Sequence, residues 1–169
     1  MTASTFRIVR ALPGDAADLH QMVRELAEFE HLAELCVSTP GDLERALFGP
    51  RPVAEALIAR VNGISEDVAG FALFFHTYST FLGRPSLWLE DVFVRAPYRG
   101  QGLGRRFLAE LAALAQDRGC GRFEWAVLDW NQPAISFYES LGANVLPDWR
   151  IARVTGDSLV RLARDSSLD

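Results

Sequence analysis

The chain has 169 residues, of which 49% are hydrophobic and 23% are charged, the composition of one ordinary globular domain. Its 17 lysine and arginine residues against 22 aspartate and glutamate residues give a net charge of -5, which argues against a nucleic-acid-binding surface and favours cationic partners. Because residues 1–10 lack the pattern of a signal peptide and no apolar run reaches the ~18 residues of a membrane span, we expect a cytoplasmic protein without a membrane partner.

The N-terminal part is predicted to form a strand followed by two helices. Apolar and basic residues alternate over Phe6–Arg10, as in a half-buried strand, and Asp15 is placed to cap the helix that follows, from Ala16 to about Glu30. A shorter helix fits Asp42–Phe48, which Gly49-Pro50 terminates. The apolar residues of the first helix recur at three- and four-residue spacing, at Leu19, Met22, Val23, Leu26 and Phe29.

The middle of the chain is predicted to be rich in strands. Val53–Val61 and Val68–His76 read as two strands, joined by a hairpin connection that begins at Asn62-Gly63. Leu87–Val94 reads as a third long strand, and the strongest helical stripe in the chain follows over Gly102–Asp117.

The C-terminal part is predicted to contain a strand at Phe123–Leu128 and a short helix from Pro133 to Leu141, with strand material in Trp149–Thr155 and Ser158–Leu162. This order of elements predicts an α+β fold with one central sheet. No repeat or linker divides it, so we expect one domain over residues 1–169.

The segment Arg99-Gly100-Gln101-Gly102-Leu103-Gly104 directly follows a predicted strand and opens the best predicted helix. Glycines let the backbone approach a ligand closely, so successive N–H groups at a helix start can bind a diphosphate. Arg99, Arg105 and Arg106 add positive charge there. The alternative is a tight strand-to-helix turn carrying an exposed arginine cluster. The sequence has no GxxxxGK[ST] loop. A Rossmann fingerprint would lie in the first βαβ unit near the N-terminus, whereas this glycine segment follows a later strand.

Three stretches together resemble the GNAT acetyltransferases. Arg99, Gly102 and Gly104 match the family's pattern of Gln or Arg, two residues, Gly, one residue, then Gly or Ala. Leu89–Val94 before this loop and Asp129–Gly142 after it are similar to the diamine (spermidine/spermine) and thialysine acetyltransferase branch. The resemblance implies the GNAT fold, a central mixed and largely antiparallel sheet flanked by helices with splayed fourth and fifth strands. It also implies acetyl-CoA as co-substrate and a homodimer.

The resemblance implies that the pantetheine arm of acetyl-CoA lies between the splayed strands. Phe93 and Val94 would hydrogen-bond it through their backbones, Asn131 would contact the arm, and Tyr138 would approach the sulfur. The implied cofactor-binding residues are Phe93, Val94, Arg99, Gly100, Gln101, Gly102, Leu103, Gly104, Arg105, Asn131 and Tyr138.

Direct acetyl transfer needs a deprotonated amine, a polarised carbonyl and a proton for the departing thiolate. Tyr138 is the candidate acid, because a phenol with a pKa of about 10 can protonate such a thiolate. The alternative is a helix aromatic packed on the sheet. Glu90 and Asp91 adjoin each other on a strand, so their side chains should point to opposite faces. They attract an ammonium substrate or, alternatively, sit at the solvated end of the strand.

The resemblance favours Glu90 as the base, acting through water. Trp149 would cover a bound alkyl-ammonium chain, with a core position as its alternative. The implied substrate-binding residues are Glu90, Asp91, Glu30, Asp129 and Trp149. Polyamine-acetylating members carry an acidic residue where this chain has Ser79, so a short diamine or lysine-like amino acid such as thialysine is the expected small-molecule substrate.

Two other functions stay open at this stage. One is acetylation of a protein or peptide amine, which requires an open groove. The other is a non-catalytic acetyl-CoA sensor. No metal site is predicted, because His20, His31 and His76 have no partners at metal-ligand spacing. Cys36 and Cys120 lack CxxC spacing and are predicted to be reduced thiols.

Overall fold

A computed structural model describes residues 5–63 and 67–167. The chain divides into two compact units, Met1–Ala126 and Val127–Asp169, and each is described by itself. Among the described residues, no helix is long and apolar enough to span a bilayer.

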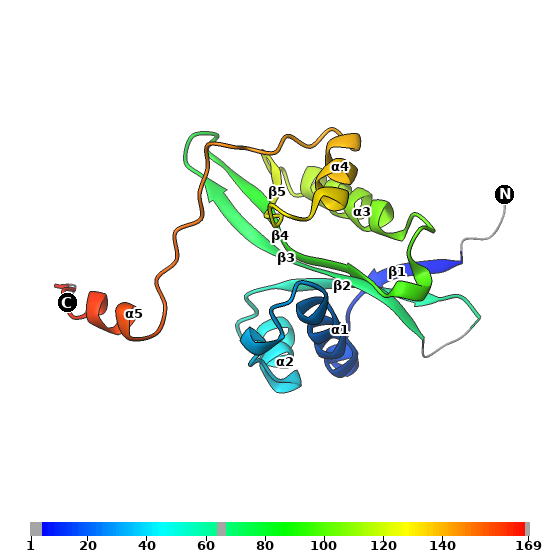
Figure 1. Ribbon diagram of the computed structural model, residues 1–169, viewed down its shortest axis with the longest axis horizontal. Coiled ribbons are helices and arrows are strands. Elements are labelled where there is room, and N and C mark those ends of the chain that lie inside the picture. The colour runs from blue at the N-terminus through cyan, green and yellow to red at the C-terminus, as the bar shows by residue number, and fades with distance from the viewer. Residues whose placement is uncertain (1–4, 64–66, 168–169) are drawn as a thin grey trace. The chain divides into compact units, whose positions relative to one another are not determined.

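The first unit is built on a five-stranded sheet whose spatial order follows the sequence (Figure 1). Its first four strands are antiparallel neighbours, whereas the fifth runs parallel to the fourth, which confirms the predicted mixed, largely antiparallel sheet. The strands are β1 (Phe6–Arg10), β2 (Glu55–Val61), β3 (Val68–Ser79), β4 (Arg84–Val94) and β5 (Phe123–Trp125).

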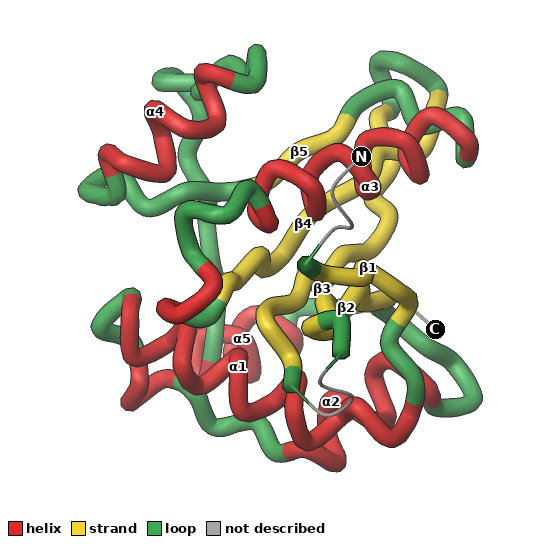
Figure 2. The backbone as a smooth tube through the Cα atoms, turned by 90° about the vertical axis from the view of Figure 1, so that its right-hand side faces the viewer, coloured by secondary structure: helices red, strands yellow, loops and turns green. Residues whose placement is uncertain are grey.

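Helices cover both faces of this sheet. On one face lie α1 (Ala16–Phe29) and α2 (Pro40–Phe48), and on the other lies α3 (Leu103–Asp117), as Figures 1 and 2 show from two directions. The predicted helical stripes account for this arrangement, because each helix has an apolar side that must be buried.

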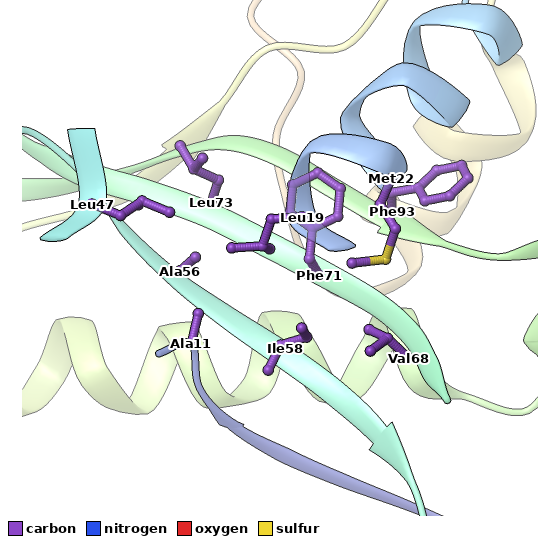
Figure 3. Close-up of a cluster of buried hydrophobic side chains, with 10 residues drawn as sticks. All are labelled: Ala11, Leu19, Met22, Leu47, Ala56, Ile58, Val68, Phe71, Leu73 and Phe93. Atoms are coloured by element: carbon purple, nitrogen blue, oxygen red, sulfur yellow. The ribbon is translucent and has the colours of Figure 1, made fainter. Parts of the chain in front are cut away.

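The core between α1, α2 and the sheet is drawn in Figure 3. Leu19 and Met22 of α1 are fully buried against Ile58 of β2 and Phe71 of β3, and Phe93 of β4 is 7% exposed. Burial of each such side chain contributes roughly 1.5–3 kcal/mol, so this layer holds α1 firmly on the strands that carry the candidate site.

Several element boundaries differ from the sequence-based prediction. The second helix begins at Pro40 rather than Asp42, because Thr39 is its cap: Thr39 Oγ1 accepts from the Asp42 amide at 3.2 Å, and Asp42 Oδ2 accepts from the Thr39 amide at 2.8 Å. β3 and β4 extend beyond the predicted ends at His76 and Leu87, because their pairing continues to Ser79 and Arg84. β2 and β3 form the predicted hairpin, and residues 64–66 of its connection lie outside the described residues.

Asp15 occupies the N-cap position of α1 as predicted, but its side chain makes no capping hydrogen bond to that helix. Its carboxylate accepts a hydrogen bond of 2.8 Å from the Leu12 amide and forms an ion pair with Arg60 of β2. A short 3-10 turn, Pro13–Asp15, precedes α1, so the side chain of Asp15 closes that turn instead. The sequence pattern Pro-Gly-Asp does not distinguish these two roles.

The strand β5 is shorter than predicted. It pairs with Leu87–Leu89 of β4, and the parallel register ends at Trp125 instead of continuing to Leu128. Beyond that point, Asp91–Val94 pair with a strand only on the β3 side within the described part of the chain. Strands that splay apart stop pairing, so the early end of the β4–β5 pairing agrees with the predicted splay of the fourth and fifth strands.

Up to residue 167, the second unit contains two helices, α4 (Gln132–Ser140) and α5 (Gly156–Ala163). The first agrees with the prediction to within one residue at each end. The predicted strand material at Trp149–Thr155 and Ser158–Leu162 is wrong, because the first segment has no regular structure and the second lies inside α5. A five-residue segment with three apolar residues fits either period, and here Leu159 and Leu162 share a helical face.

Candidate active site

The glycine loop turns sharply between β4 and α3. Gly100 and Gly102 have φ angles of +73° and +76°, and Gly102 is the N-cap of α3. A Cβ atom at either position would meet no atom within 4 Å, so the need for glycine is torsional and the chain itself does not crowd the loop. The first N–H groups of this fifteen-residue helix have no intrahelical partner, so they suit a diphosphate.

The other loop residues have distinct environments. Leu103 is buried, so its side chain serves the core and only its backbone can face a ligand. Gln101 Nε2 donates to the Pro97 carbonyl at 3.3 Å, and Arg105 is exposed on the first turn of α3. Arg106, in contrast, donates to the Phe6 carbonyl at 3.1 Å.

Arg99 points toward α1 and β4. Its guanidinium carbon lies 5.1 Å from the centre of the Phe29 ring and 5.5 Å from that of the Phe93 ring, and its Nε donates to the Val94 carbonyl at 2.8 Å. The predicted arginine cluster therefore divides into residues with different structural partners.

A β-bulge lies at Glu90. Leu89 pairs with Phe74 and Asp91 pairs with Leu73, so Glu90 is an extra residue on β4 without a counterpart on β3. Bulges redirect side chains and are frequent beside active sites. The simple alternation of faces that the sequence predicts for Glu90 and Asp91 does not hold across such a bulge.

Glu90 is exposed and has a partner that sequence reasoning missed. The indole Nε1 of Trp88 donates a hydrogen bond of 2.9 Å to Glu90 Oε2. Two residues spaced by two on a strand share a face, and this spacing is the signal that would have indicated the pair.

Asp91 is partly buried within β4, which argues against the solvated-strand-end alternative for this residue. Burial, and then the neighbouring charges of Glu90 and Glu30, raise the pKa of Asp91 to about 6. Burial also raises the pKa of Glu30, the residue that ends α1. The structure thus brings together three of the predicted substrate-binding carboxylates, Glu30, Glu90 and Asp91.

Phe93 and Val94 end β4 directly before the loop. Gly70 of β3 pairs with Val94, and a Cβ atom on Gly70 would collide with the Phe93 carbonyl oxygen and lie 3.2 Å from Val94 Cα. The two strands therefore approach at a position where only glycine fits without a shift.

The remaining predicted site residues belong to the second unit. Asn131 caps α4, with its Oδ1 accepting from the Ala134 amide at 3.3 Å. Tyr138 lies two helical turns further on, so the two residues lie on one side of the helix. Asp129 is exposed, and Trp149 is 76% exposed between α4 and α5.

Ser79 has a structural role. It is 3% exposed at the end of β3, and its hydroxyl accepts from the Leu82 amide at 3.2 Å within the hairpin turn. This position supplies no charge to a distant ammonium group. Cys36 and Cys120 are both free thiols, in agreement with the sequence-based prediction.

Comparison with known proteins gives a family match and close relatives. Residues 20–143 match the model of the acetyltransferase (GNAT) family. The chain is 38% identical over 169 residues to a thialysine N-epsilon-acetyltransferase of Mus musculus, covering 95% of this chain and 98% of that protein. It is 34% identical over 195 residues to an L-ornithine N5-acetyltransferase of Arabidopsis thaliana, covering 90% and 86%.

Solved structures share the fold. An integron cassette protein from the mobile metagenome of V. cholerae has a TM-score of 0.79 at 24% identity, covering 95% of this chain and 99% of that one. An aminoglycoside acetyltransferase from an uncultured soil metagenomic sample has a TM-score of 0.74 at 14% identity, covering 92% and 99%. At these identities the likeness concerns the fold alone.

Proposed function

The chain belongs to the GNAT family of acetyltransferases, as its sequence predicts, and from this premise we propose that it transfers acetyl from acetyl-CoA directly to the primary amine of a small cationic molecule. The observation that carries the proposal is the carboxylate cluster of Glu30, Glu90 and Asp91, located on the strand that leads into the glycine loop and on the helix packed beside it. An anionic cluster there suits a cationic acceptor.

Acetyl-CoA, the co-substrate of the family, supplies the activated acetyl group as a thioester. We propose that the backbone of Gly100–Gly104 binds its diphosphate, with Arg105 adding positive charge, because the first N–H groups of a helix have no intrahelical partner. The backbones of Phe93 and Val94 would hold the pantetheine arm along the side of β4 that β5 leaves uncovered.

For the acceptor, each carboxylate has a distinct proposed role. Asp91, ionised above pH 6, attracts the ammonium group, and Glu30 adds to the negative potential. We propose that Glu90 accepts the ammonium proton through water; its exposure and its hydrogen bond from Trp88 support this role. The resulting neutral amine is the nucleophile that direct transfer requires.

The second unit contributes the remaining proposed groups. Tyr138 would donate a proton to the departing thiolate, and Asn131 would contact the pantetheine arm. Asp129 and Trp149 would line the acceptor's path, Asp129 by charge and Trp149 by its exposed ring. The family match runs continuously from residue 20 to residue 143, across the boundary between the two units, which supports one functional domain over residues 1–169.

A lysine-like amino acid is the proposed acceptor. The mouse relative is a thialysine acetyltransferase and the plant relative an L-ornithine acetyltransferase. Both of these substrates carry a terminal primary amine on a short chain. The neutral hairpin residue Ser79 adds no second anionic anchor of the kind a long polyamine needs.

A thiol-release assay with acetyl-CoA tests the proposal. The panel contains thialysine, lysine, ornithine, putrescine, spermidine, spermine and two lysine-containing peptides. We expect the highest kcat/KM for thialysine or ornithine, and a fall of about 100-fold in E90Q with little change in acetyl-CoA affinity. Turnover only on peptides would favour protein acetylation, and acetyl-CoA binding without any turnover would favour a sensor.

We also propose a cytoplasmic homodimer that binds neither nucleic acid nor membrane. The two free cysteines suit a reducing compartment, and the acidic net charge opposes nucleic-acid binding. Dimerisation rests on the family resemblance. Size-exclusion chromatography with light scattering checks it, and a monomer at micromolar concentration would refute it.

A further inference from the structure

Arg99 links two elements that carry the carboxylate cluster. Its guanidinium lies over the rings of Phe29, the last residue of α1, and Phe93, near the end of β4, at 5.1 and 5.5 Å. Its Nε donates to the Val94 carbonyl at 2.8 Å. One side chain from the glycine loop therefore connects the end of a helix to the end of a strand.

Each ring stands next to a carboxylate of the cluster. Glu30 directly follows Phe29 and is the C-cap of α1. Asp91 precedes Phe93 by two residues on β4, beyond the bulge, so both point to the sheet face that α1 covers. Holding Phe29 against Phe93 therefore also holds Glu30 near Asp91.

The positive charge of Arg99 does not neutralise this cluster. Within residues 5–63 and 67–167, no ion pair joins Arg99 to Glu30 or to Asp91. The guanidinium instead interacts with ring faces and a carbonyl oxygen. The carboxylates consequently keep their negative potential for a cationic ligand.

We infer that Arg99 is a positioning residue for the acceptor amine, which holds the end of α1 on β4 so that Glu30 and Asp91 face one ammonium group. This role differs from the phosphate contact that the loop pattern suggests for Arg99. The inference rests on the proposed function, since it assigns a means of organising that same site.

Lysine and arginine distinguish the two roles. A lysine ammonium is an effective point charge for a phosphate. It lacks the planar guanidinium of arginine, which can interact with two aromatic rings while the arginine Nε donates to a carbonyl. If Arg99 bound phosphate, R99K would retain most of the acetyl-CoA affinity lost in R99Q. If Arg99 positions α1, R99K and R99Q should both raise the amine KM by a similar factor.

The experiment compares R99K, R99Q and F29L with R24Q, which removes an exposed arginine from the same helix. Acetyl-CoA Kd is measured by calorimetry, and amine KM and kcat by thiol release. We expect amine KM to rise about 5- to 10-fold in the first three variants, with acetyl-CoA Kd within about twofold of the wild type. Combining R99Q with F29L adds little further loss, because both remove one contact.

Hydrogen exchange gives a readout that does not depend on turnover. In R99Q, the amides of residues 28–32 should exchange faster, whereas R24Q leaves them unchanged. A wild type that acetylates no amine would refute the proposed function, while exchange would still decide the role of Arg99. The inference is overturned if exchange in R99Q is unchanged, or if acetyl-CoA Kd rises about tenfold in R99Q and is restored in R99K.

Discussion

The indole Nε1 of Trp88 donates a hydrogen bond of 2.9 Å to the carboxylate of Glu90, two positions further along β4 and inside a β-bulge. The bulge removes Glu90 from the regular pairing with β3, and the indole gives its carboxylate a fixed partner. A charge-assisted hydrogen bond of this kind orients the oxygen that a bound water would use.

Replacing Trp88 by phenylalanine removes the indole N–H and keeps an aromatic ring. Since Glu90 then loses its orienting donor, we expect kcat to fall about 3- to 10-fold, as for an exposed hydrogen bond to a charged group. Steady-state kinetics on the preferred amine measures this effect. The double variant W88F/E90Q should be no slower than E90Q alone, and a further multiplicative loss would contradict the proposed partnership.

Asp91→Asn should stabilise the protein and impair its activity. Because the pKa of Asp91 rises from 3.8 to about 6 on folding, ionising it at pH 7 costs up to about 3 kcal/mol of folding free energy. Urea denaturation at pH 7.5 should show D91N more stable than the wild type. Its amine KM should rise at least tenfold, because the anion that attracts the ammonium is lost.

The pH dependence of these effects has a defined direction. Between pH 4 and 6 the folded protein retains the Asp91 proton that the unfolded chain has released, so wild-type stability falls relative to D91N as pH rises through this window. At pH 4 the two proteins should unfold at similar urea concentrations. Over the same window kcat/KM for the amine should rise with pH in the wild type, and a stability difference independent of pH would contradict this assignment.

Most of the fold could be predicted because its signals are local. The stripes of α1 and α3 and the apolar runs of β2 and β3 each fit one period, and the resemblance supplied the mixed sheet. The C-terminal segment failed, since Ser158–Leu162 is too short to separate helix from strand. The cap of α2 at Thr39 was also missed, although the pair Thr39 and Asp42 has the spacing of a capping box.

The candidate site was predictable in residue types but not in arrangement. The acidic pair on β4 and the glycine loop could be chosen from their positions in the sequence. The bulge at Glu90 could not, because an extra residue in one strand is defined only by its pairing with β3. For the same reason, the partners of Arg99 are long-range contacts that no local spacing indicates.

Tyr138→Phe tests the proposed acid directly. Removing the phenolic hydroxyl leaves the ring of α4, which contacts Phe137 with ring centres 5.4 Å apart, so the helix should remain folded. We expect kcat to fall about 100-fold, the usual contribution of general acid catalysis, with acetyl-CoA Kd within about twofold of the wild type. Stopped-flow turnover and calorimetry measure the two quantities. Unchanged turnover would remove Tyr138 as the acid.

Gly70→Ala tests whether the close approach of β3 to β4 supports the cofactor-binding end of β4. The added methyl group would collide with the backbone carbonyl of Phe93, which cannot move aside as a flexible side chain would. We expect the free energy of unfolding to fall by about 1–3 kcal/mol. Acetyl-CoA Kd should rise about fivefold or more, because the displaced backbone belongs to the residues proposed to bind pantetheine.

Gly14→Ala is the matched control for this substitution. A Cβ atom at Gly14 meets no atom within 4 Å, so the same change of residue type lacks the collision and should leave the unfolding free energy within about 1 kcal/mol of the wild type. Urea denaturation and calorimetric titration with acetyl-CoA compare the two variants. A G70A protein with reduced stability and unaltered acetyl-CoA affinity would place pantetheine away from Phe93 and Val94, because a shift of this strand end must alter any contact made through its backbone.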